Sequence, residues 1–363
     1  MISANTNVAV DRIMKQLASL NSSDKNSLPT IARIGCVSKI DKELRKHLVL
    51  VSSDRMAAER EIKRVNDKDP VLAKLLETTK SSGNSFTDQQ RSLATSADIC
   101  GLTCASATNP YFLSMNIDFP ILILDEASQM LETTSLLPLC ASKAKKMLIV
   151  GDPLQLPPTM ASSTNATEPV KGESSYIDRT LFDRLYNNDF RVTMLRTQYR
   201  CHPKIAGICS QLFYSNNVIH GVQAADRAMH PTFRGLSPVN AMHCQGQEMR
   251  RFDSYVNETE ALYIKELVNF FLTKIKDGDN DDNSNPVPNY SIGVICLYKA
   301  QSYIIANLVG NGNKAENPNP NLVVATVDSF QGSEMGMILL LLLSLLLLLL
   351  LLLLSRYHNY IDL

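Results

Sequence analysis

The sequence predicts an α/β protein whose two domains are each built on a parallel sheet. Short, continuous apolar runs recur along the chain, at Ile31–Val37, Ile99–Cys104, Ile121–Leu124, Met147–Val150, Ile292–Leu297 and Leu322–Val327. Continuous rather than alternating apolarity is typical of strands that are buried on both faces of a parallel sheet. Amphipathic helical patterns lie between these runs, and this alternation favours doubly wound sheets.

Two segments show the helical pattern clearly. The first predicts an apolar stripe along one helix face, formed by Val10, Ile13, Met14, Leu17 and Leu20. We expect Asp11, Arg12 and Lys15 to lie off this stripe. The second predicted helix starts after Asn257, a candidate N-cap with Glu260 three residues later, and ends at Gly278.

The composition excludes two classes of protein. The 363 residues include 45% hydrophobic and 20% charged residues, so a packed core is possible and disorder is excluded as the main state. The 36 basic and 36 acidic residues give a formal net charge of zero, which excludes a globally basic nucleic-acid binder but not a local basic groove.

The cysteines indicate reduced thiols rather than a disulfide framework or a metal site. Eight cysteines are spread along the chain and no CxxC occurs. The closest pair, Cys100 and Cys104, lacks two further ligands at zinc-finger spacing, so we expect no structural zinc in this segment. The N-terminus has no basic region followed by an apolar one, so no secretory signal is expected.

Polar stretches divide the chain. Residues 161–175 and 277–289 are expected to be surface loops, and the acidic run in the second lacks the Gly and Glu positions of a calcium-binding loop. The best domain boundary falls at residues 187–190. We therefore expect domains at residues 1–190 and 191–343, followed by a polyleucine segment at residues 344–363.

The first motif with chemical meaning is ILILDEASQ, an apolar run that ends in Asp125 and Glu126. Ligands of open α/β sheets bind at the carboxyl ends of the strands. An aspartate there can hold Mg²⁺, and the following glutamate can polarise a water that attacks a γ-phosphate. The alternative is a strand that ends in two surface acids.

Three further motifs follow in order. LIVGDPLQLPPT leads from a strand into a loop whose prolines fix the backbone around Gln155, and we expect this loop beside the one that carries Asp125. LRTQYRCHP offers a guanidinium, Arg200, and an aromatic ring, Tyr199, suited to a phosphoryl group and a base. VATVDSFQGSE takes a strand into a polar loop that contains Glu334.

These four motifs, together with NTNVAVD at residues 5–11 and IGVICLYKAQ at residues 292–301, resemble the superfamily 1 helicases of the up-frameshift, 5′-to-3′ branch. The resemblance covers residues 1–343. Within that branch, ARIGCVSKIDKELR and the DEASQ, GDPLQLPPT and QYRCHP segments look closest to the GRF zinc-finger-containing DNA helicases. The resemblance implies two RecA-like domains of the P-loop NTPase type, both incomplete.

The resemblance also implies roles for individual residues, with ATP and Mg²⁺ as cofactors. Asp125 would bind Mg²⁺, Glu126 would be the catalytic base, and Gln155 would couple the γ-phosphate to the nucleic-acid groove. Tyr199 would pack on the adenine, Arg200 would reach the γ-phosphate, and Glu334 would lie in the nucleotide cleft. The expected path of a single strand, DNA more than RNA, is lined by Thr6, Asn7, Thr103 and Thr326 to Ser329.

One family motif has no counterpart here. Phosphate-binding loops of this class need G-x-x-x-x-G-K-[ST], and no Gly-Lys dipeptide occurs in the chain. We expect the first strand, the loop and the first helix to be lost upstream of Met1. That strand would be central, so its loss would expose strand edges and apolar faces. Because the last arginine-bearing motif is also missing, we expect this chain alone to be inactive as an ATPase.

The polyleucine tail permits two interpretations. Met335–Leu354 is long enough to span a bilayer, which would tether the protein to a membrane. The run also interrupts a soluble motif where a buried strand belongs, so a frameshift in a repeat tract or a mis-predicted exon is the favoured explanation.

The expected function is that of an ATP-dependent helicase core, nuclear rather than cytoplasmic and associated with DNA repair. The alternative is a non-catalytic, membrane-tethered nucleic-acid-binding protein.

Overall fold

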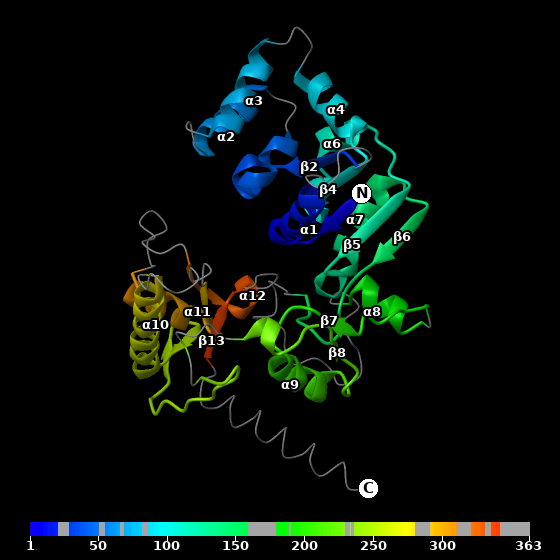
Figure 1. Cartoon of the computed structure of the whole chain (residues 1–363). Coiled ribbons are helices and arrows are strands. Elements are labelled where there is room, and N and C mark those ends of the chain that lie inside the picture. The colour runs from blue at the N-terminus through cyan, green and yellow to red at the C-terminus, as the bar shows by residue number, and fades with distance from the viewer. Residues whose placement is uncertain are drawn as a thin grey trace. The chain divides into compact units, whose positions relative to one another are not determined.

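The computed structural model describes most of the chain. The described residues are 1–20, 29–50, 55–65, 69–81, 86–158, 179–188, 190–228, 233, 236–279, 291–310, 321–330 and 335–341. They form two compact units, Met1–Thr193 and Met194–Leu363, which are described separately below (Figure 1).

A parallel sheet forms the centre of unit 1. Its strands are β1 (Ile2–Ala4), β2 (Ile31–Gly35), β3 (Leu48–Leu50), β4 (Ile99–Thr103), β5 (Ile121–Asp125) and β6 (Lys146–Ile149). They pair in the order β3-β2-β4-β1-β5-β6. Neighbours that are distant in sequence require crossover connections, which the helices supply.

Helices of unit 1 pack against the two faces of this sheet and against the turns beside it. They are α1 (Asn7–Leu20), α2 (Arg55–Val65), α3 (Pro70–Ser81), α4 (Phe86–Ser96), α5 (Cys104–Ala107), α6 (Pro110–Ser114), α7 (Glu132–Ser142) and α8 (Leu181–Tyr186), with 3₁₀ turns at Val37–Lys39, Lys42–His47 and Ala127–Gln129. One core cluster joins Ile31 of β2 to Val10 and Met14 of α1, and the other joins Ile34 of β2 to Phe112 of α6. Residues alternating along β2 thus face different helical layers.

Strand β6 was expected to be buried on both of its faces, but it is partly exposed. Met147 is 36% exposed and Leu148 is 55% exposed, because β6 pairs only with β5 and ends the sheet. The six strands of this sheet are continuously paired, and β6 is one of its two edge strands. The exposed apolar side chains lie at this edge strand.

Unit 2 contains a three-stranded parallel sheet, in the order β12-β11-β13. Its strands are β11 (Ile292–Cys296), β12 (Leu322–Thr326) and β13 (Met337–Leu341), and helices α10 (Glu258–Asp279) and α11 (Lys299–Leu308) share its core cluster. The other elements are β7 (Thr197–Gln198), β8 (Ile219–His220), β9 (Met249–Arg251), β10 (Ser254–Val256), α9 (Pro203–Phe213), α12 (Val327–Phe330) and a 3₁₀ turn at Ala225–Arg227.

The structure confirms the α/β class, and each of the six apolar runs contains or overlaps a strand. Both predicted helices form, and Asn257 caps α10 by accepting the backbone N–H of Glu260 at 3.1 Å. Asp11, expected off the apolar stripe of α1, is nevertheless buried, because it pairs with Arg33 of β2. The expected loop at residues 277–289 begins later, since α10 continues through Asp279.

Two predictions concern segments of uncertain placement. The loop at residues 161–175 lies outside the described residues, as does most of the polyleucine tail. The start of the leucine run is described, and it forms strand β13 beside β11. Within the described parts of the chain, no helix is long and apolar enough to cross a membrane.

Candidate active site

Three strands of unit 1 bring the predicted site residues to one edge of the sheet. Ala4, the last residue of β1, lies opposite Thr103 of β4 on one side and Asp125 of β5 on the other. Thr6 and Asn7 follow directly after β1. Because the strands are parallel, all these residues lie at the carboxyl edge, where such sheets bind ligands.

Asp125 has the chemistry of a cation ligand. Its Oδ2 atom is buried and has no hydrogen-bond partner among the described residues. Burial raises the pKa of this carboxyl, while the charge of Arg12 and the backbone N–H of Glu126 oppose the shift. A buried carboxylate oxygen left without a donor costs free energy, and a divalent cation would remove that cost. The residue therefore fits the predicted Mg²⁺ site.

Glu126 leaves the strand in an unusual backbone conformation. Its φ of 56° lies in the left-handed region, which is rare for a residue other than glycine and recurs at functional sites. The side-chain amide of Gln129 donates to Glu126 Oε2 at 2.8 Å. Glu126 therefore has a carboxylate held in place beside Asp125, as a positioned base requires.

The loop after β6 is fixed against the loop after β5, as we expected from their order. Asp152 N donates to Ser128 Oγ at 3.1 Å, and Ala127 N donates to Val150 O at 2.9 Å. A Cβ atom on Gly151 would lie 2.8 Å from Ser128 N, so this close approach requires glycine. Gln155 is exposed in the loop, where its amide donates to Asp152 Oδ2 at 2.9 Å.

The three residues of unit 1 that are predicted to bind single-stranded nucleic acid differ in their contacts. Thr6 and Thr103 use their hydroxyl groups as caps, accepting the backbone N–H groups of Ala9 at 3.2 Å and Ser106 at 3.3 Å. Asn7 Oδ1 accepts a bond from Arg33 Nη2 at 2.9 Å. Because arginine can only donate, this contact fixes the orientation of the amide and places its NH₂ group away from Arg33.

Unit 2 holds Tyr199 and Arg200 in a tight turn after β7. Gln198 Oε1 accepts the backbone N–H groups of Arg200 at 2.9 Å and Cys201 at 3.0 Å. Arg227 donates to Tyr199 O at 2.8 Å and to Arg200 O at 3.0 Å. The Tyr199 side chain is 65% exposed. The turn thus fixes the backbone of both residues while leaving the aromatic ring accessible.

Thr326 and Ser329 form a second polar turn, at the carboxyl end of β12. Their hydroxyl oxygens lie 2.8 Å apart, and Ser329 Oγ accepts the Thr326 N–H at 2.9 Å. Glu334 lies outside the described residues.

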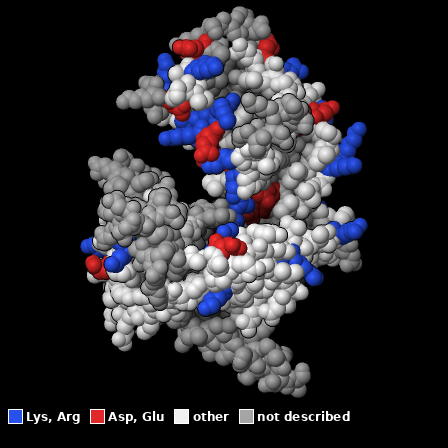
Figure 2. All heavy atoms as spheres, viewed as in Figure 1, with Lys and Arg blue, Asp and Glu red and all other residues white. Residues whose placement is uncertain are grey.

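Basic side chains of unit 1 lie among acidic ones. Lys15 pairs with Asp41 at 2.9 Å. Figure 2 shows basic and acidic side chains interspersed on the visible face of unit 1. Binding of a nucleic-acid backbone here would therefore use hydroxyl, amide and backbone N–H donors as well as positive charge.

Arg33 and Asp11 occur in quoted motif segments, but the motifs assigned no role to either residue. Arg33 Nε donates to Asp11 Oδ1 at 2.6 Å, and Asp11 Oδ2 accepts the Asp41 N–H at 2.8 Å. A signal was present, since an arginine inside an apolar strand and an aspartate inside an apolar helix each need a partner.

Among the residues that the structure describes, no group of three or more His, Cys, Asp or Glu side chains could hold a metal ion together. Cys100 and Cys104 are buried free thiols, and burial raises the pKa of Cys100 to about 11. Both cysteines are therefore protonated side chains that contribute to packing.

Comparison with known proteins supports the motif analysis over both units. Two family models, each described as an AAA domain, match residues 46–163 and 177–343. The mouse 5′-3′ DNA helicase ZGRF1 is 32% identical over 336 residues, which are 92% of this chain and 17% of the relative.

Two further relatives are similar to this chain. A probable helicase of Dictyostelium discoideum is 29% identical over 93% of the chain and 33% of its own length. A regulator of nonsense transcripts 1 homolog of Neurospora crassa is 30% identical over 69% of the chain and 22% of its own length. The chain spans a third or less of each of these relatives.

Proposed function

Because the chain belongs to the superfamily 1 helicases of the up-frameshift type, we propose that it is part of the core of an ATP-dependent helicase that moves 5′ to 3′ along single-stranded DNA. The preference for DNA and the polarity follow the name of the mouse relative, a 5′-3′ DNA helicase. A role in DNA repair in the nucleus is part of the same proposal.

One observation carries the proposal most directly. Asp125, with its buried unpartnered oxygen, lies in register with Ala4 and thus next to the turn that presents Thr6 and Asn7. The proposed cation site would therefore adjoin a set of neutral donors suited to a nucleic-acid backbone. This adjacency is what coupling of hydrolysis to strand movement requires.

The proposed division of labour follows from these contacts. Asp125 would hold Mg²⁺, which when bound neutralises charge on the phosphates. Glu126, held by Gln129, would take the proton of the attacking water, and Gln155 would relay the state of the phosphates to the strand path.

The family resemblance also gives roles to residues of unit 2. Tyr199 would pack on the adenine, and Arg200 and Glu334 would contact the nucleotide. Thr326 and Ser329 would continue the strand path. The accessible ring of Tyr199 supports its role.

The test compares this chain with a longer protein that also carries a G-x-x-x-x-G-K-[ST] loop. We expect the longer protein to hydrolyse ATP when single-stranded DNA is added and to unwind a forked duplex that has a 5′ tail. The 363-residue chain contains no Gly-Lys dipeptide, so it should bind the strand but hydrolyse ATP at the background rate. Unwinding only from a 3′ tail would contradict the proposed polarity.

The hydroxyl and amide donors of Thr6, Asn7 and Thr103 would serve equally well in a second candidate function, that of a non-catalytic nucleic-acid-binding protein. Hydrolysis by the longer protein would argue against this alternative. Binding of strands without hydrolysis by either protein would favour it.

A further inference from the structure

The hairpin of β9 and β10 carries a side chain that the fold does not require. Arg251 pairs with Ser254, so the loop consists of Phe252 and Asp253. Phe252 has a φ of 57° and is 91% exposed, the largest fraction among the exposed large hydrophobic residues of the described chain. Glycine or asparagine is the usual residue at such a position. Exposure and strain both cost free energy here, as is common at functional sites.

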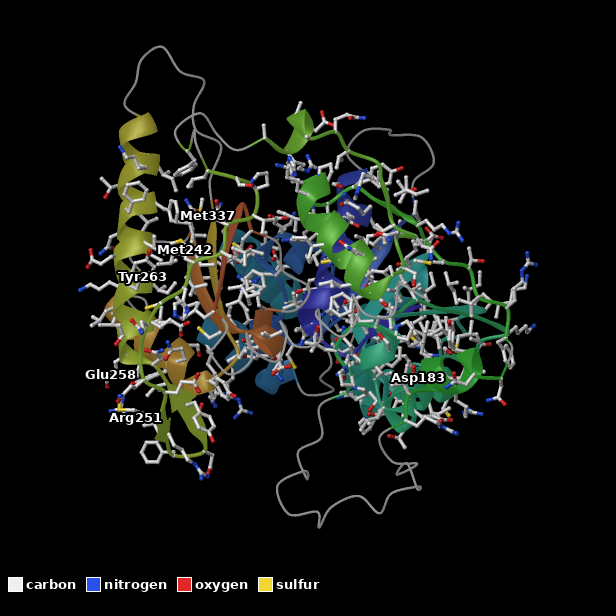
Figure 3. The ribbon with its side chains drawn as sticks, turned by 90° about the horizontal axis from the view of Figure 1, so that it is seen from below. Asp183, Met242, Arg251, Glu258, Tyr263 and Met337 are labelled. Atoms are coloured by element: carbon white, nitrogen blue, oxygen red, sulfur yellow. The ribbon has the colours of Figure 1, made fainter. Side chains whose placement is uncertain are left out.

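Two arginines accompany the exposed ring. Arg250 and Arg251 are exposed on β9, and Arg250 Nε donates to Phe252 O at 3.3 Å. In Figure 3 the hairpin that carries Arg251 extends beyond the first turn of α10, which is marked by Glu258. An accessible aromatic ring next to guanidinium groups is the combination that stacks on a base and contacts its phosphates.

The hairpin is attached at the carboxyl edge of the second sheet. Ala300 N donates to Ser254 Oγ at 3.1 Å, and the rings of Tyr255 and Tyr298 meet edge to face with centroids 5.2 Å apart. Tyr298 follows β11, whose last residue, Cys296, lies opposite Thr326 of β12. The hairpin therefore projects from the edge that carries the predicted strand-binding residues of unit 2.

The register of the hairpin joins these groups on one face. Arg250 lies opposite Tyr255, so their side chains share a face of the two-stranded ribbon. Tyr255 in turn contacts Tyr298. Arg250, Tyr255 and Tyr298 thus form a row of neighbouring side chains from the hairpin to the edge of the sheet.

We propose that the β9–β10 hairpin is a further contact site for single-stranded nucleic acid, with Phe252 stacking on a base and Arg250 and Arg251 contacting phosphates. The inference rests on the proposed function, because it extends the strand path from Thr326 and Ser329. Asp253 offsets part of the positive charge, so stacking by the ring supplies most of the affinity at the tip.

A fluorescence experiment tests the contact directly. The sequence contains no tryptophan, so Phe252→Trp places a single indole at the tip. The full chain is titrated with a fluorescently labelled oligodeoxythymidine, while indole emission and oligonucleotide anisotropy are recorded on the same sample. We expect the indole to be quenched with the same midpoint as the rise in anisotropy, because a stacked base quenches it.

The matched control places the indole elsewhere in unit 2. Phe213, at the end of α9, is 56% exposed, and Phe213→Trp should bind equally well without quenching. Binding without quenching at position 252, or with equal quenching at both positions, would overturn the hairpin proposal alone. If the anisotropy does not rise, the chain does not bind the strand, and both the proposed function and this inference fail.

A second set of variants separates binding from folding. Phe252→Gly suits the left-handed backbone, so it should unfold at the same or a higher temperature than the wild type while losing roughly tenfold in strand affinity. Phe252→Tyr keeps a ring and should retain the affinity. Wild-type affinity in the glycine variant would overturn the proposal.

Salt dependence tests the two arginines. Each phosphate contact to a single strand contributes about 0.7 to the slope of log affinity against log salt. Arg250→Gln and Arg251→Gln should each lower the slope by about that amount. An unchanged slope in both variants would rule out the phosphate contacts.

Discussion

Arg33 and Asp11 form a buried ion pair between β2 and α1, with Arg33 Nε donating to Asp11 Oδ1 at 2.6 Å. The Arg33 side chain is fully buried and that of Asp11 is 9% exposed. Arg33 also donates to Ile34 O at 2.7 Å and to Asn7 Oδ1 at 2.9 Å. The pair therefore links the position of α1 to the orientation of a predicted strand-binding side chain.

We predict that breaking this pair destabilises unit 1. Arg33→Met or Asp11→Leu should each cost about 3 kcal/mol in the free energy of unfolding, because either change leaves one buried charge without its partner. Urea unfolding monitored by circular dichroism measures the loss. The double variant should recover much of it, since no buried charge remains. Additive losses in the double variant would mean that the two residues act independently.

Glu126→Gln should abolish turnover and preserve nucleotide binding in the longer protein that carries a phosphate-binding loop. The amide keeps the shape of the side chain but cannot accept a proton, so we expect at least a 100-fold lower rate of ATP hydrolysis, within the usual range for a general base. Steady-state hydrolysis and nucleotide titration measure the two properties. A rate close to that of the wild type would show that another group is the base.

Asp125→Asn should stabilise the chain at neutral pH in the absence of divalent ions. Burial raises the pKa of Asp125, so above the ordinary pKa of an aspartate the folded state holds a proton more tightly than the unfolded state. The folded state therefore loses stability as the pH rises from the ordinary pKa of an aspartate to the higher pKa of folded Asp125. The asparagine variant avoids this loss, and its advantage should shrink at acid pH. Thermal unfolding across pH measures both effects.

Asp98→Asn provides a control with the opposite sign. The backbone and hydroxyl groups of Thr30 lower the pKa of Asp98, so its carboxylate stabilises the folded state above the ordinary pKa of an aspartate. The variant should therefore be less stable than the wild type at neutral pH. A shift in the same direction for both variants would contradict the electrostatic explanation.

The sequence was sufficient to predict the longer strands of the two parallel sheets, because apolar runs such as Ile31–Val37 and Ile292–Leu297 have few other ways to be buried. The shorter strands were not predicted from the sequence. Ile2–Ala4 and Leu48–Leu50 are only three residues long, and their place in the sheet depends on partners distant in sequence. The exposure of Leu148 also depends on sheet order, which periodicity does not encode.

The motifs identified the candidate site residues but not the hydrogen bonds that hold them in place. DEASQ pointed to Asp125 and Glu126, and the structure adds the contact of Gln129 with Glu126. QYR pointed to Tyr199 and Arg200, whereas Arg227, which fixes their turn, lies in a separate segment with no motif of its own. Such supporting contacts arise only when the chain folds, so spacing along the sequence could not reveal them.

Gly221 offers a way to displace the Tyr199 ring without changing Tyr199 itself. Gly221 N donates to Gln198 O at 2.9 Å, and a Cβ atom at this position would collide with the ring of Tyr199. Because the ring is 65% exposed, it can move away while the turn stays folded. Gly221→Ala in the longer protein should therefore raise the KM for ATP severalfold through lost adenine packing, and Tyr199→Ala should have the same effect.

Gly207→Ala is the matched control for this substitution. Gly207 lies inside α9, and apart from its chain neighbours and the local helix backbone no atom of the described residues lies within 4 Å of the position that its Cβ would occupy. This variant should keep the KM for ATP and gain about 0.5–1 kcal/mol in stability, because alanine favours a helix interior. Steady-state kinetics and thermal unfolding of the three variants test the assignment. An unchanged KM in both Gly221→Ala and Tyr199→Ala would show that the ring does not contact the nucleotide.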